Sequence, residues 1–292
     1  MTKVKKAKIS LVLSYMITFP HGKINLGLNV TQKRNDGFHN IETVFFPIHW
    51  NDILEIVEDK QNNSKEKVTF SHSGLKIQGE NKNNLVIKSY KQLDNDYSLP
   101  PVKIHLHKSI PMGAGLGGGS ADAAYTIRTI NDLFKLGLDS AKQTSYAKKL
   151  GSDCAFFIEG KPVLGTGKGD QFEPIELNFE GMEIMVIWPA IHSGTAEAYS
   201  GIVPSVPDKS LREILKSDIK LWKHELKNDF EKTIFPIYPE LEKIKFMLYE
   251  SGAVYASMSG SGSAIFGLFE NKTPTIPLPE HYHVHITNFS FH

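Results

Sequence analysis

The chain has 292 residues, of which 40% are hydrophobic and 22% charged, and its formal net charge at pH 7 is +1. This composition is typical of a globular protein with one large or two ordinary domains. The small net charge argues against a nucleic-acid-binding surface as the main function. The single cysteine, Cys154, excludes an internal disulfide and a cysteine-rich metal site, and it favours a reducing compartment.

The first residues superficially resemble a secretory signal, because four lysines within the first eight positions precede an apolar run from Ile9 to Ile17. No small-residue cleavage site follows, and no apolar run approaches the roughly 20 residues that span a membrane. We therefore expect residues 1–15 to be a disordered extension, or the product of a start codon assigned too early. We expect a cytoplasmic protein.

The first predicted strand is His21-Gly-Lys-Ile-Asn-Leu-Gly-Leu-Asn-Val30, in which apolar and polar residues alternate. Alternation predicts one apolar face and one polar face, made of Ile24, Leu26, Leu28 and Val30 and of Lys23, Asn25 and Gly27. A lysine and an asparagine two residues apart can converge on one polar ligand. The alternative is a half-exposed strand with a solvated lysine.

A turn is predicted at Asn35-Asp-Gly37, after which Phe38 and His39 enter a second strand that runs through Thr43-Val-Phe-Phe46. The Phe38 ring fits either a core position or a ligand contact, and His39 fits either a solvated loop or a ligand contact. Residues 52–80 predict two or three strands, and residues 83–93 predict a helix.

The most informative segment is Pro111-Met-Gly-Ala-Gly-Leu-Gly-Gly-Gly-Ser120, between a predicted strand at Val102–His107 and a predicted helix at Ala121–Phe134. Five of the seven residues from 113 to 119 are glycines, which favours a backbone that turns sharply or approaches a ligand closely. A helix start adds unpaired N–H groups and a positive dipole end, which together bind anions such as phosphate. The alternative is a flexible surface turn. Neither the Walker pattern nor the dinucleotide fingerprint fits this loop.

A helix is predicted at Ala141–Leu150, capped by Asp139, and Gly151 follows it. Asp153 then precedes an apolar run at Ala155–Ile158, which we predict to be a strand. Asp153 is either a turn residue at the helix end or a functional acid. The neighbouring Cys154 is better explained as a small buried residue than as a nucleophile.

The carboxyl-terminal half begins near a second glycine-rich turn, Leu164–Gln171, where we place the domain boundary. An apolar strand is predicted at Glu183–Pro189, and Tyr199 after it fits either core packing or a ligand contact. Residues 208–251 predict three helices, broken at residues 216–218 and 235–239. Strands predicted at 253–257 and 265–269 flank a glycine–serine turn, and the alternation at 281–291 predicts a last strand.

In this order the segments resemble those of the GHMP small-molecule kinases, the family of galactokinase, homoserine kinase and mevalonate kinase. The Lys23 strand, the glycine loop and the Met258–Phe266 turn resemble its three motifs, and Gly151-Ser-Asp153 resembles the segment with its catalytic base. The block Asp36-Gly-Phe-His39 resembles the branch that phosphorylates 4-diphosphocytidyl-2-C-methyl-D-erythritol. The likeness spans about residues 19–289.

The resemblance implies an α+β, two-domain GHMP kinase fold, with a ribosomal protein S5 domain 2-like amino-terminal domain and a ferredoxin-like carboxyl-terminal domain. We place the ATP-binding domain at residues 16–170 and the second domain, which contributes to substrate binding, at residues 171–292. The implied reaction is ATP-dependent phosphorylation of a hydroxyl of 4-diphosphocytidyl-2-C-methyl-D-erythritol to give its 2-phosphate, in the non-mevalonate route to isoprenoid precursors. Mg²⁺ is expected from the reaction type. The implied partners are ATP and a cytidine diphosphate-linked polyol, with neither nucleic acid nor a membrane.

The resemblance also implies roles for individual residues. Asp153 would take the proton from the acceptor hydroxyl, and Lys23 would keep that carboxylate ionised and orient it. Ser120 would help at the phosphate or at magnesium, although no set of metal ligands is implied. The implied ATP-binding residues are Pro111, Met112, Gly113, Ala114, Gly115, Leu116, Gly117, Gly118, Gly119 and Ser120, and the implied substrate-binding residues are Asn25, Phe38, His39, Thr195 and Tyr199.

Phe38 would stack on the cytosine, with Tyr199 as the second face of a sandwich. Phenylalanine stands where tyrosine is usual in the family, so stacking is expected to persist while any hydroxyl contact is lost. One alternative is a GHMP kinase for mevalonate or homoserine, which has no use for a cytidine clamp. The other is a non-catalytic nucleotide-binding relative, which needs neither Lys23 nor Asp153.

Overall fold

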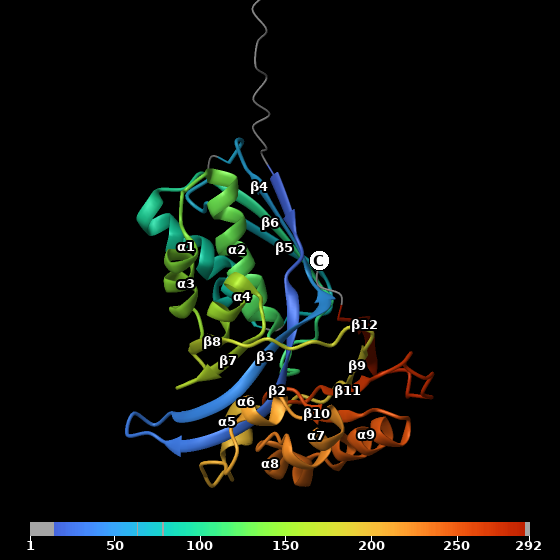
Figure 1. Ribbon diagram of the computed structural model, residues 1–292. Coiled ribbons are helices and arrows are strands. Elements are labelled where there is room, and N and C mark those ends of the chain that lie inside the picture. The colour runs from blue at the N-terminus through green and yellow to red at the C-terminus, as the bar shows by residue number, and fades with distance from the viewer. Residues whose placement is uncertain (1–14, 63, 78, 290–292) are drawn as a thin grey trace, which may run out of the picture.

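The computed structural model describes residues 15–62, 64–77 and 79–289. Two long strands, β2 (His21–Lys33) and β3 (His39–Asn51), run from the amino-terminal half into the carboxyl-terminal half (Figure 1). The expectation of disorder at residues 1–15 falls almost wholly outside the described residues. Tyr15, which is described, belongs to the short strand β1 (Tyr15–Thr18). Within the described residues, no helix is long and apolar enough to cross a membrane.

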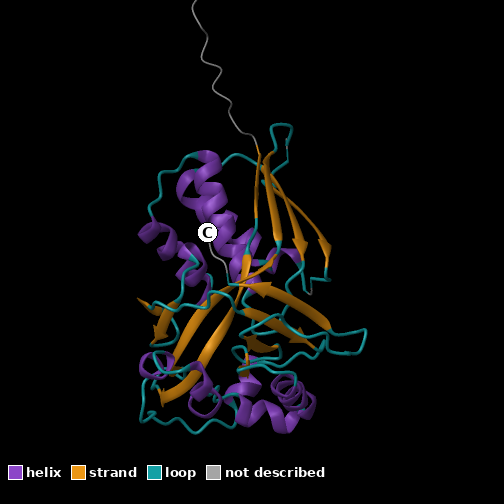
Figure 2. Cartoon of the chain, turned by 45° about the vertical axis from the view of Figure 1, so that its right-hand side comes forward, coloured by secondary structure: helices purple, strands orange, loops and turns teal. Residues whose placement is uncertain are grey.

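The first sheet has the strand order β1-β4-β6-β5 and is antiparallel except between β5 and β6. Its further strands are β4 (Ile53–Glu58), β5 (Val68–Gly74) and β6 (Val102–Lys108). Helices α1 (Leu85–Tyr97), α2 (Gly118–Phe134), α3 (Ser140–Lys148) and α4 (Phe156–Glu159) lie on one side of it (Figures 1 and 2). Leu54, Ile56, Ile104 and Leu106 of the sheet are buried in one cluster with apolar residues of these helices.

Local sequence signals explain where these helices begin. The helix predicted at residues 121–134 is confirmed as α2, which starts three residues earlier because Gly118, Gly119 and Ser120 form its first turn. The predicted cap of α3 is also confirmed, since Asp139 Oδ1 accepts a hydrogen bond from Lys142 N at 2.8 Å. A short 3₁₀ turn (Asn81–Asn83) precedes α1.

The strand predicted at residues 155–158 is wrong. Asp153–Ala155 form a 3₁₀ turn that continues directly into α4. A short apolar run has no period that separates a strand from a buried helical turn. Here Phe156, Phe157 and Ile158 are buried as a helical turn in the same core cluster as α2.

The second sheet has the order β2-β3-β7-β8 and is antiparallel. Its last two strands, β7 (Val163–Thr166) and β8 (Gln171–Pro174), form a hairpin around the second glycine-rich turn. The boundary predicted between residues 170 and 171 falls inside this hairpin, so the chain leaves the sheet only after Pro174.

A bulge at Gly27 changes which face of β2 is apolar. Leu26 is paired with Val44 but Leu28 with Thr43, and the register shifts between them. Gly27 supplies the φ of +70° that such a bulge requires. The prediction that Leu28 and Val30 share a face with Ile24 is therefore wrong, because beyond the bulge they lie on the face of Lys23 and Asn25.

The carboxyl-terminal sheet has the order β10-β11-β9-β12 and is antiparallel throughout. Its strands are β9 (Glu183–Trp188), β10 (Tyr255–Met258), β11 (Ile265–Phe269) and β12 (His283–Asn288). Between β9 and β10 lie α5 (Thr195–Tyr199), α6 (Leu211–Leu215), α7 (Ile219–Glu225), α8 (Glu231–Ile237) and α9 (Pro239–Glu250), drawn in orange at the bottom of Figure 1.

Residues 208–251 thus form four helices rather than the predicted three. Ser210 caps α6 with a capping box, and Asp218 caps α7. Pro236 does not break α8 but lies in its last turn, and Pro239 stands at the first position of α9, where its missing N–H costs nothing. The predicted α+β class with two halves is confirmed.

Replacing Gly27 with alanine should lower the free energy of unfolding by about 2–4 kcal/mol, from backbone strain and overpacking. A Cβ there would lie 2.6 Å from Leu226 Cδ1 and 2.7 Å from Leu211 Cδ2, at a φ of +70°. The matched control is Gly137→Ala, which has the same φ of +70° and nothing within 4 Å of the new Cβ. Urea unfolding of both variants measures the difference. Equal losses would contradict the steric role of Leu211 and Leu226.

Candidate active site

A cavity of about 540 Å³ is lined by residues from both halves of the molecule. The amino-terminal half contributes β2, the glycine loop and residues 151–153, and the carboxyl-terminal half contributes residues 192–195 and 260–262. Nearly all the residues predicted from sequence to act together lie at this cavity. Leu116, Phe38 and His39 are the three predicted residues that do not line it.

The glycine loop reaches the cavity with the first turn of α2, where Gly118, Gly119 and Ser120 line the wall. A 17-residue helix presents its free N–H groups and positive dipole end there, which favours a phosphate group. Leu116 is fully buried and takes part through its carbonyl oxygen, which accepts a hydrogen bond from Lys23 N at 2.9 Å. The loop is therefore fixed to β2 through a backbone hydrogen bond.

Gly115 is the point at which the loop touches the carboxyl-terminal half. A Cβ on this residue would lie 1.9 Å from Ser259 O, so no other residue fits at this position. Ser259 Oγ donates to Gly115 O at 3.0 Å, and Ala264 N donates to Ala114 O at 3.0 Å. The glycine–serine turn thus packs against the glycine loop.

The ammonium of Lys23 lies near oxygen atoms of three residues. Its Nζ donates to Asn25 Oδ1 at 2.5 Å and to Gly115 O at 2.6 Å, and it lies 3.8 Å from Asp153 Oδ2. Burial lowers the pKa of Lys23, and the nearby carboxylate of Asp153 opposes that shift. The structure therefore brings the lysine, the aspartate and the glycine loop to one cavity.

Asp153 differs from Lys23 in its access to the cavity. Its side chain is 35% exposed, against 4% for Lys23, so the carboxylate can meet a bound molecule while the ammonium stays behind it. The adjacent Cys154 is fully buried, and burial raises the pKa of its thiol to about 11. This thiol is unsuited to act as a nucleophile.

The predicted acceptor-binding residues are divided between the cavity and the β2–β3 hairpin. Asn25, Thr195 and Tyr199 line the cavity, and Thr195 Oγ1 lies 3.3 Å from Ser261 Oγ. The ring that stacks on Tyr199 is His39, with centroids 4.7 Å apart and planes 18° from parallel. Phe38 is 59% exposed at the tip of the β2–β3 hairpin and makes no sandwich with Tyr199 in this structure.

Sequence reasoning missed several residues that line the cavity. The His192 ring packs on Gly113, where a Cβ would lie 2.2 Å from its Nδ1 and Cε1. Ser193 and Lys168 also line the wall. None of these carries a local pattern that separates it from an ordinary loop residue. Asn228 stabilises the glycine–serine turn, because its Nδ2 donates to Met258 O and Gly260 O, both at 2.8 Å.

A buried cluster of charged side chains fixes the residues that lead into the glycine loop. Lys108 Nζ donates to Asp52 and, at 2.9 Å, to Asp122 Oδ2, and all three residues are at most 3% exposed. Asp52 Oδ1 also accepts from Ser109 N and Ile110 N, which lead into the loop. Burial raises the pKa of Asp122 to about 7, although Lys108 acts to lower it. The cluster joins the end of β6, the start of β4 and the start of α2.

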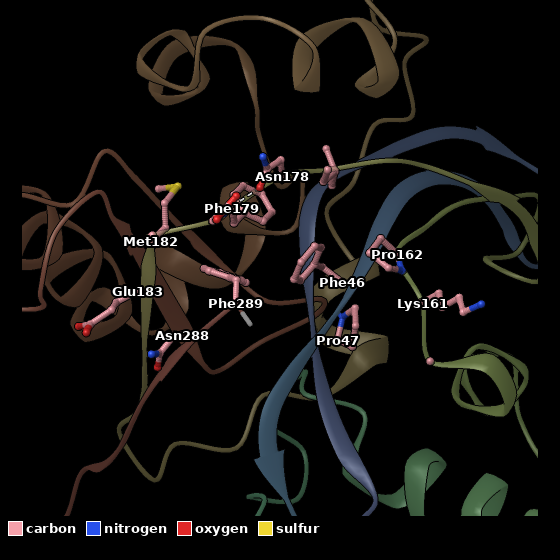
Figure 3. Close-up of a pocket in the computed structure, with 14 residues that line it drawn as sticks. Phe46, Pro47, Lys161, Pro162, Asn178, Phe179, Met182, Glu183, Asn288 and Phe289 are labelled. Atoms are coloured by element: carbon pink, nitrogen blue, oxygen red, sulfur yellow. Dashed lines mark hydrogen bonds between the residues drawn. The ribbon is translucent and has the colours of Figure 1, made fainter. Parts of the chain in front are cut away.

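A second cavity, of about 800 Å³, holds none of the predicted site residues (Figure 3). Phe46, Phe179 and Phe289 meet in its wall, with ring centroids 4.8–5.3 Å apart. Phe45, the neighbour of Phe46 on β3, lines the first cavity instead. The two cavities therefore lie on opposite faces of this strand.

The described residues contain no cluster of three or more metal-ligating side chains. The first cavity offers one carboxylate, Asp153, and the Ser120 hydroxyl. This donor set suits a Mg²⁺ ion only if phosphate oxygens and water complete its coordination, as is common for Mg²⁺ at phosphate sites.

Comparison with known proteins gives consistent matches. Residues 84–161 match the GHMP kinases N terminal domain, and residues 210–275 match the GHMP kinases C terminal domain. The chain is 52% identical over 254 residues to a 4-diphosphocytidyl-2-C-methyl-D-erythritol kinase of Bacteroides fragilis, which covers 87% of this chain and 92% of that one. It is 48% identical over 274 residues to the enzyme of that name from Cytophaga hutchinsonii, covering 94% and 97%.

Solved structures agree with these relatives. A crystal structure of 4-(cytidine 5'-diphospho)-2C-methyl-D-erythritol kinase has a TM-score of 0.75 and 30% identity, over 88% of this chain and 91% of that one. A homoserine kinase from Cytophaga hutchinsonii has a TM-score of 0.67 at 15% identity, covering 97% of each chain, and shows the shared fold alone.

Replacing Lys108 with methionine should lower the free energy of unfolding by about 3–5 kcal/mol, because Asp52 and Asp122 would be left buried without their counter-ion. The control is Lys103→Met on the same strand, whose exposed ion pair with Asp59 spans 3.4 Å and should contribute less than about 1 kcal/mol. Denaturant unfolding at pH 8 measures both. A small, equal effect for the two variants would contradict the supporting role of the cluster.

Proposed function

The chain belongs to the 4-diphosphocytidyl-2-C-methyl-D-erythritol kinase family of the GHMP kinases, and on this basis we propose how its residues carry out the reaction. The enzyme phosphorylates a hydroxyl of 4-diphosphocytidyl-2-C-methyl-D-erythritol with ATP, in the non-mevalonate route to isoprenoid precursors. The single observation that carries the residue assignment is the convergence of Lys23, Asp153 and the start of α2 on one cavity. Phosphoryl transfer needs positioning and charge stabilisation more than covalent chemistry, and this arrangement supplies both.

We propose that the backbone amides of residues 113–120 and the α2 dipole hold the ATP phosphates. The loop is immobilised for this task by its bonds to Lys23 N and Ala264 N. Ser120 would contribute its hydroxyl to a phosphate or to a phosphate-bound Mg²⁺, which when present neutralises part of the phosphate charge. The adjoining space between Asn83, Leu85 and Met112 is in place to receive the base of the nucleotide.

Asp153 is proposed to accept the proton of the attacking hydroxyl. Its carboxylate is open to the cavity on one side and faces Lys23 Nζ, at 3.8 Å, on the other. The ammonium fixes the orientation of the carboxylate. Asn25 in turn fixes Lys23, because it accepts from the ammonium and donates to Thr43 Oγ1 at 2.9 Å.

We propose that the cytidine end of the acceptor binds near the tip of the β2–β3 hairpin. The rings of His39 and Tyr199 are stacked there, and the exposed Phe38 directly precedes His39 in the chain. A mevalonate or homoserine kinase has no use for such rings, which supports the diphosphocytidyl acceptor over those alternatives. We also propose that the reaction takes place in the cytoplasm, in keeping with one buried, unpaired cysteine.

Replacing Asp153 with asparagine should lower kcat by about 10²- to 10⁴-fold, because the general base is lost while the shape is kept. Binding of ATP should stay measurable by calorimetry. The assay couples ADP release to the acceptor and runs beside a reaction without acceptor, so that ATP hydrolysis is subtracted. Substantial acceptor-dependent turnover in this variant would refute the role of Asp153.

Replacing Phe38 with alanine should weaken acceptor binding by about 1–3 kcal/mol, the range typical of base stacking. Phe38 is exposed, so the fold should be unaffected. The measured quantity is the KM for the acceptor, with the KM for ATP as internal control. An unchanged acceptor KM would remove Phe38 from the cytosine site and leave His39 and Tyr199 as its rings.

A further inference from the structure

The hydroxyl of Thr43, on β3, is fully buried and has two hydrogen-bond partners on β2. It donates to Gly27 O at 2.6 Å, and it accepts from Asn25 Nδ2 at 2.9 Å. Asn25 is itself 2% exposed, and its Oδ1 accepts from Lys23 Nζ at 2.5 Å. A continuous chain of hydrogen bonds therefore leads from a backbone carbonyl of β2 to the ammonium beside Asp153.

The bulge in β2 makes this carbonyl available. The register pairs Leu26 with Val44 and Leu28 with Thr43, so it passes over Gly27. The extra residue of a bulge is left out of the ladder of backbone hydrogen bonds, and its carbonyl oxygen then needs another donor. Thr43 lies beside the bulge in the register and supplies that donor from its side chain.

The direction of each hydrogen bond in this chain is determined by the bond before it. A backbone carbonyl only accepts, so the single proton of the Thr43 hydroxyl goes to Gly27 O. The hydroxyl then offers Asn25 only its lone pairs, and the amide must turn its NH₂ group toward Thr43. The amide oxygen is thereby left for the ammonium of Lys23, which only donates.

We propose that Thr43 is a positioning residue for phosphoryl transfer, which acts through Asn25 and Lys23 on the orientation of Asp153. This inference rests on the proposed function, in which Asp153 is the general base. Thr43 is fully buried and does not line the catalytic cavity, so it touches neither substrate. A base that is displaced from the reacting hydroxyl lowers the rate rather than the substrate affinity, so the effect of Thr43 belongs in kcat.

Substitutions of Thr43 can separate its hydroxyl from its volume. Thr43→Ser keeps the hydroxyl, Thr43→Ala removes it from the same smaller side chain, and Thr43→Val replaces it with a methyl group. The alanine and valine variants should lose on the order of ten-fold in kcat, with the KM values for ATP and for the acceptor within about two-fold. The serine variant should keep kcat within about two-fold. If the valine variant does not fold, the serine and alanine variants still differ only in the hydroxyl.

Thr126→Ala is the matched control. Thr126 is also fully buried, and its hydroxyl donates to a backbone carbonyl within α2, Asp122 O, at 2.7 Å. This variant should lose stability in urea unfolding but keep kcat within about two-fold. If Thr43→Ala likewise loses stability and keeps its kcat, the role of Thr43 is merely structural and the proposal is overturned. A higher KM for the acceptor at unchanged kcat would overturn it as well.

A double-mutant cycle tests the path through Asn25. In protein that already carries Asn25→Ala, replacing Thr43 with alanine should change kcat by less than about two-fold, because the amide that transmits the effect is gone. An equal loss of kcat with and without Asn25 would show that Thr43 acts by another route. That result would also overturn the proposal.

The proposed function is judged in the same assay, by acceptor-dependent ADP release from the unaltered protein. If that protein releases no ADP with the acceptor, the proposed function fails and the inference about Thr43 fails with it. If it does release ADP and Thr43→Ala has the same kcat as Thr43→Ser, only the inference about Thr43 fails.

Discussion

The active site depends on one buried ammonium group. Taking a cation out of water costs several kcal/mol unless nearby oxygens replace the water. Lys23 is 3% exposed, and its oxygens come from three separate segments: Asn25 on the same strand, Gly115 of the phosphate loop and Asp153 after α3. Each segment must be in place for the charge to be tolerated. The pairing that orients the Asp153 carboxylate, the proposed base, therefore also fixes the glycine loop.

The carboxyl-terminal half completes this arrangement, because it forms hydrogen bonds with both the glycine loop and β2. Gly115 O accepts from Lys23 and also from Ser259, so the same carbonyl joins the two halves. The turn that holds Ser259 is fixed by Asn228, and Asp229 Oδ2 accepts from Val30 N at 2.8 Å, which ties this segment back to β2. The bulge at Gly27 makes that bond possible, because it turns the outer part of β2 toward residues 227–229. The cavity therefore exists only when both halves are packed.

Sequence was sufficient where function resides in a local pattern. The strand, glycine loop and helix around residues 102–134, and the spacing of Lys23 and Asn25, follow from rules that act over a few residues. Sequence-based prediction failed where a contact between distant residues determines the local structure. The face of Leu28 depends on the bulge, and the helical form of residues 155–158 depends on packing against α2. The Lys108 cluster was also missed, because Asp52 and Asp122 are seventy residues apart in sequence and carry no shared motif.

The two ends of the site use different kinds of recognition. At the phosphate loop the proposed donors are backbone amides and a helix dipole, which any sequence with the same glycine geometry provides. At the acceptor end the proposed contacts are the side chains of Phe38, His39 and Tyr199, and Phe38 lies exposed in the β2–β3 connection. An exposed connection can change without disturbing the core, whereas the glycine loop is fixed by hydrogen bonds to both halves of the molecule.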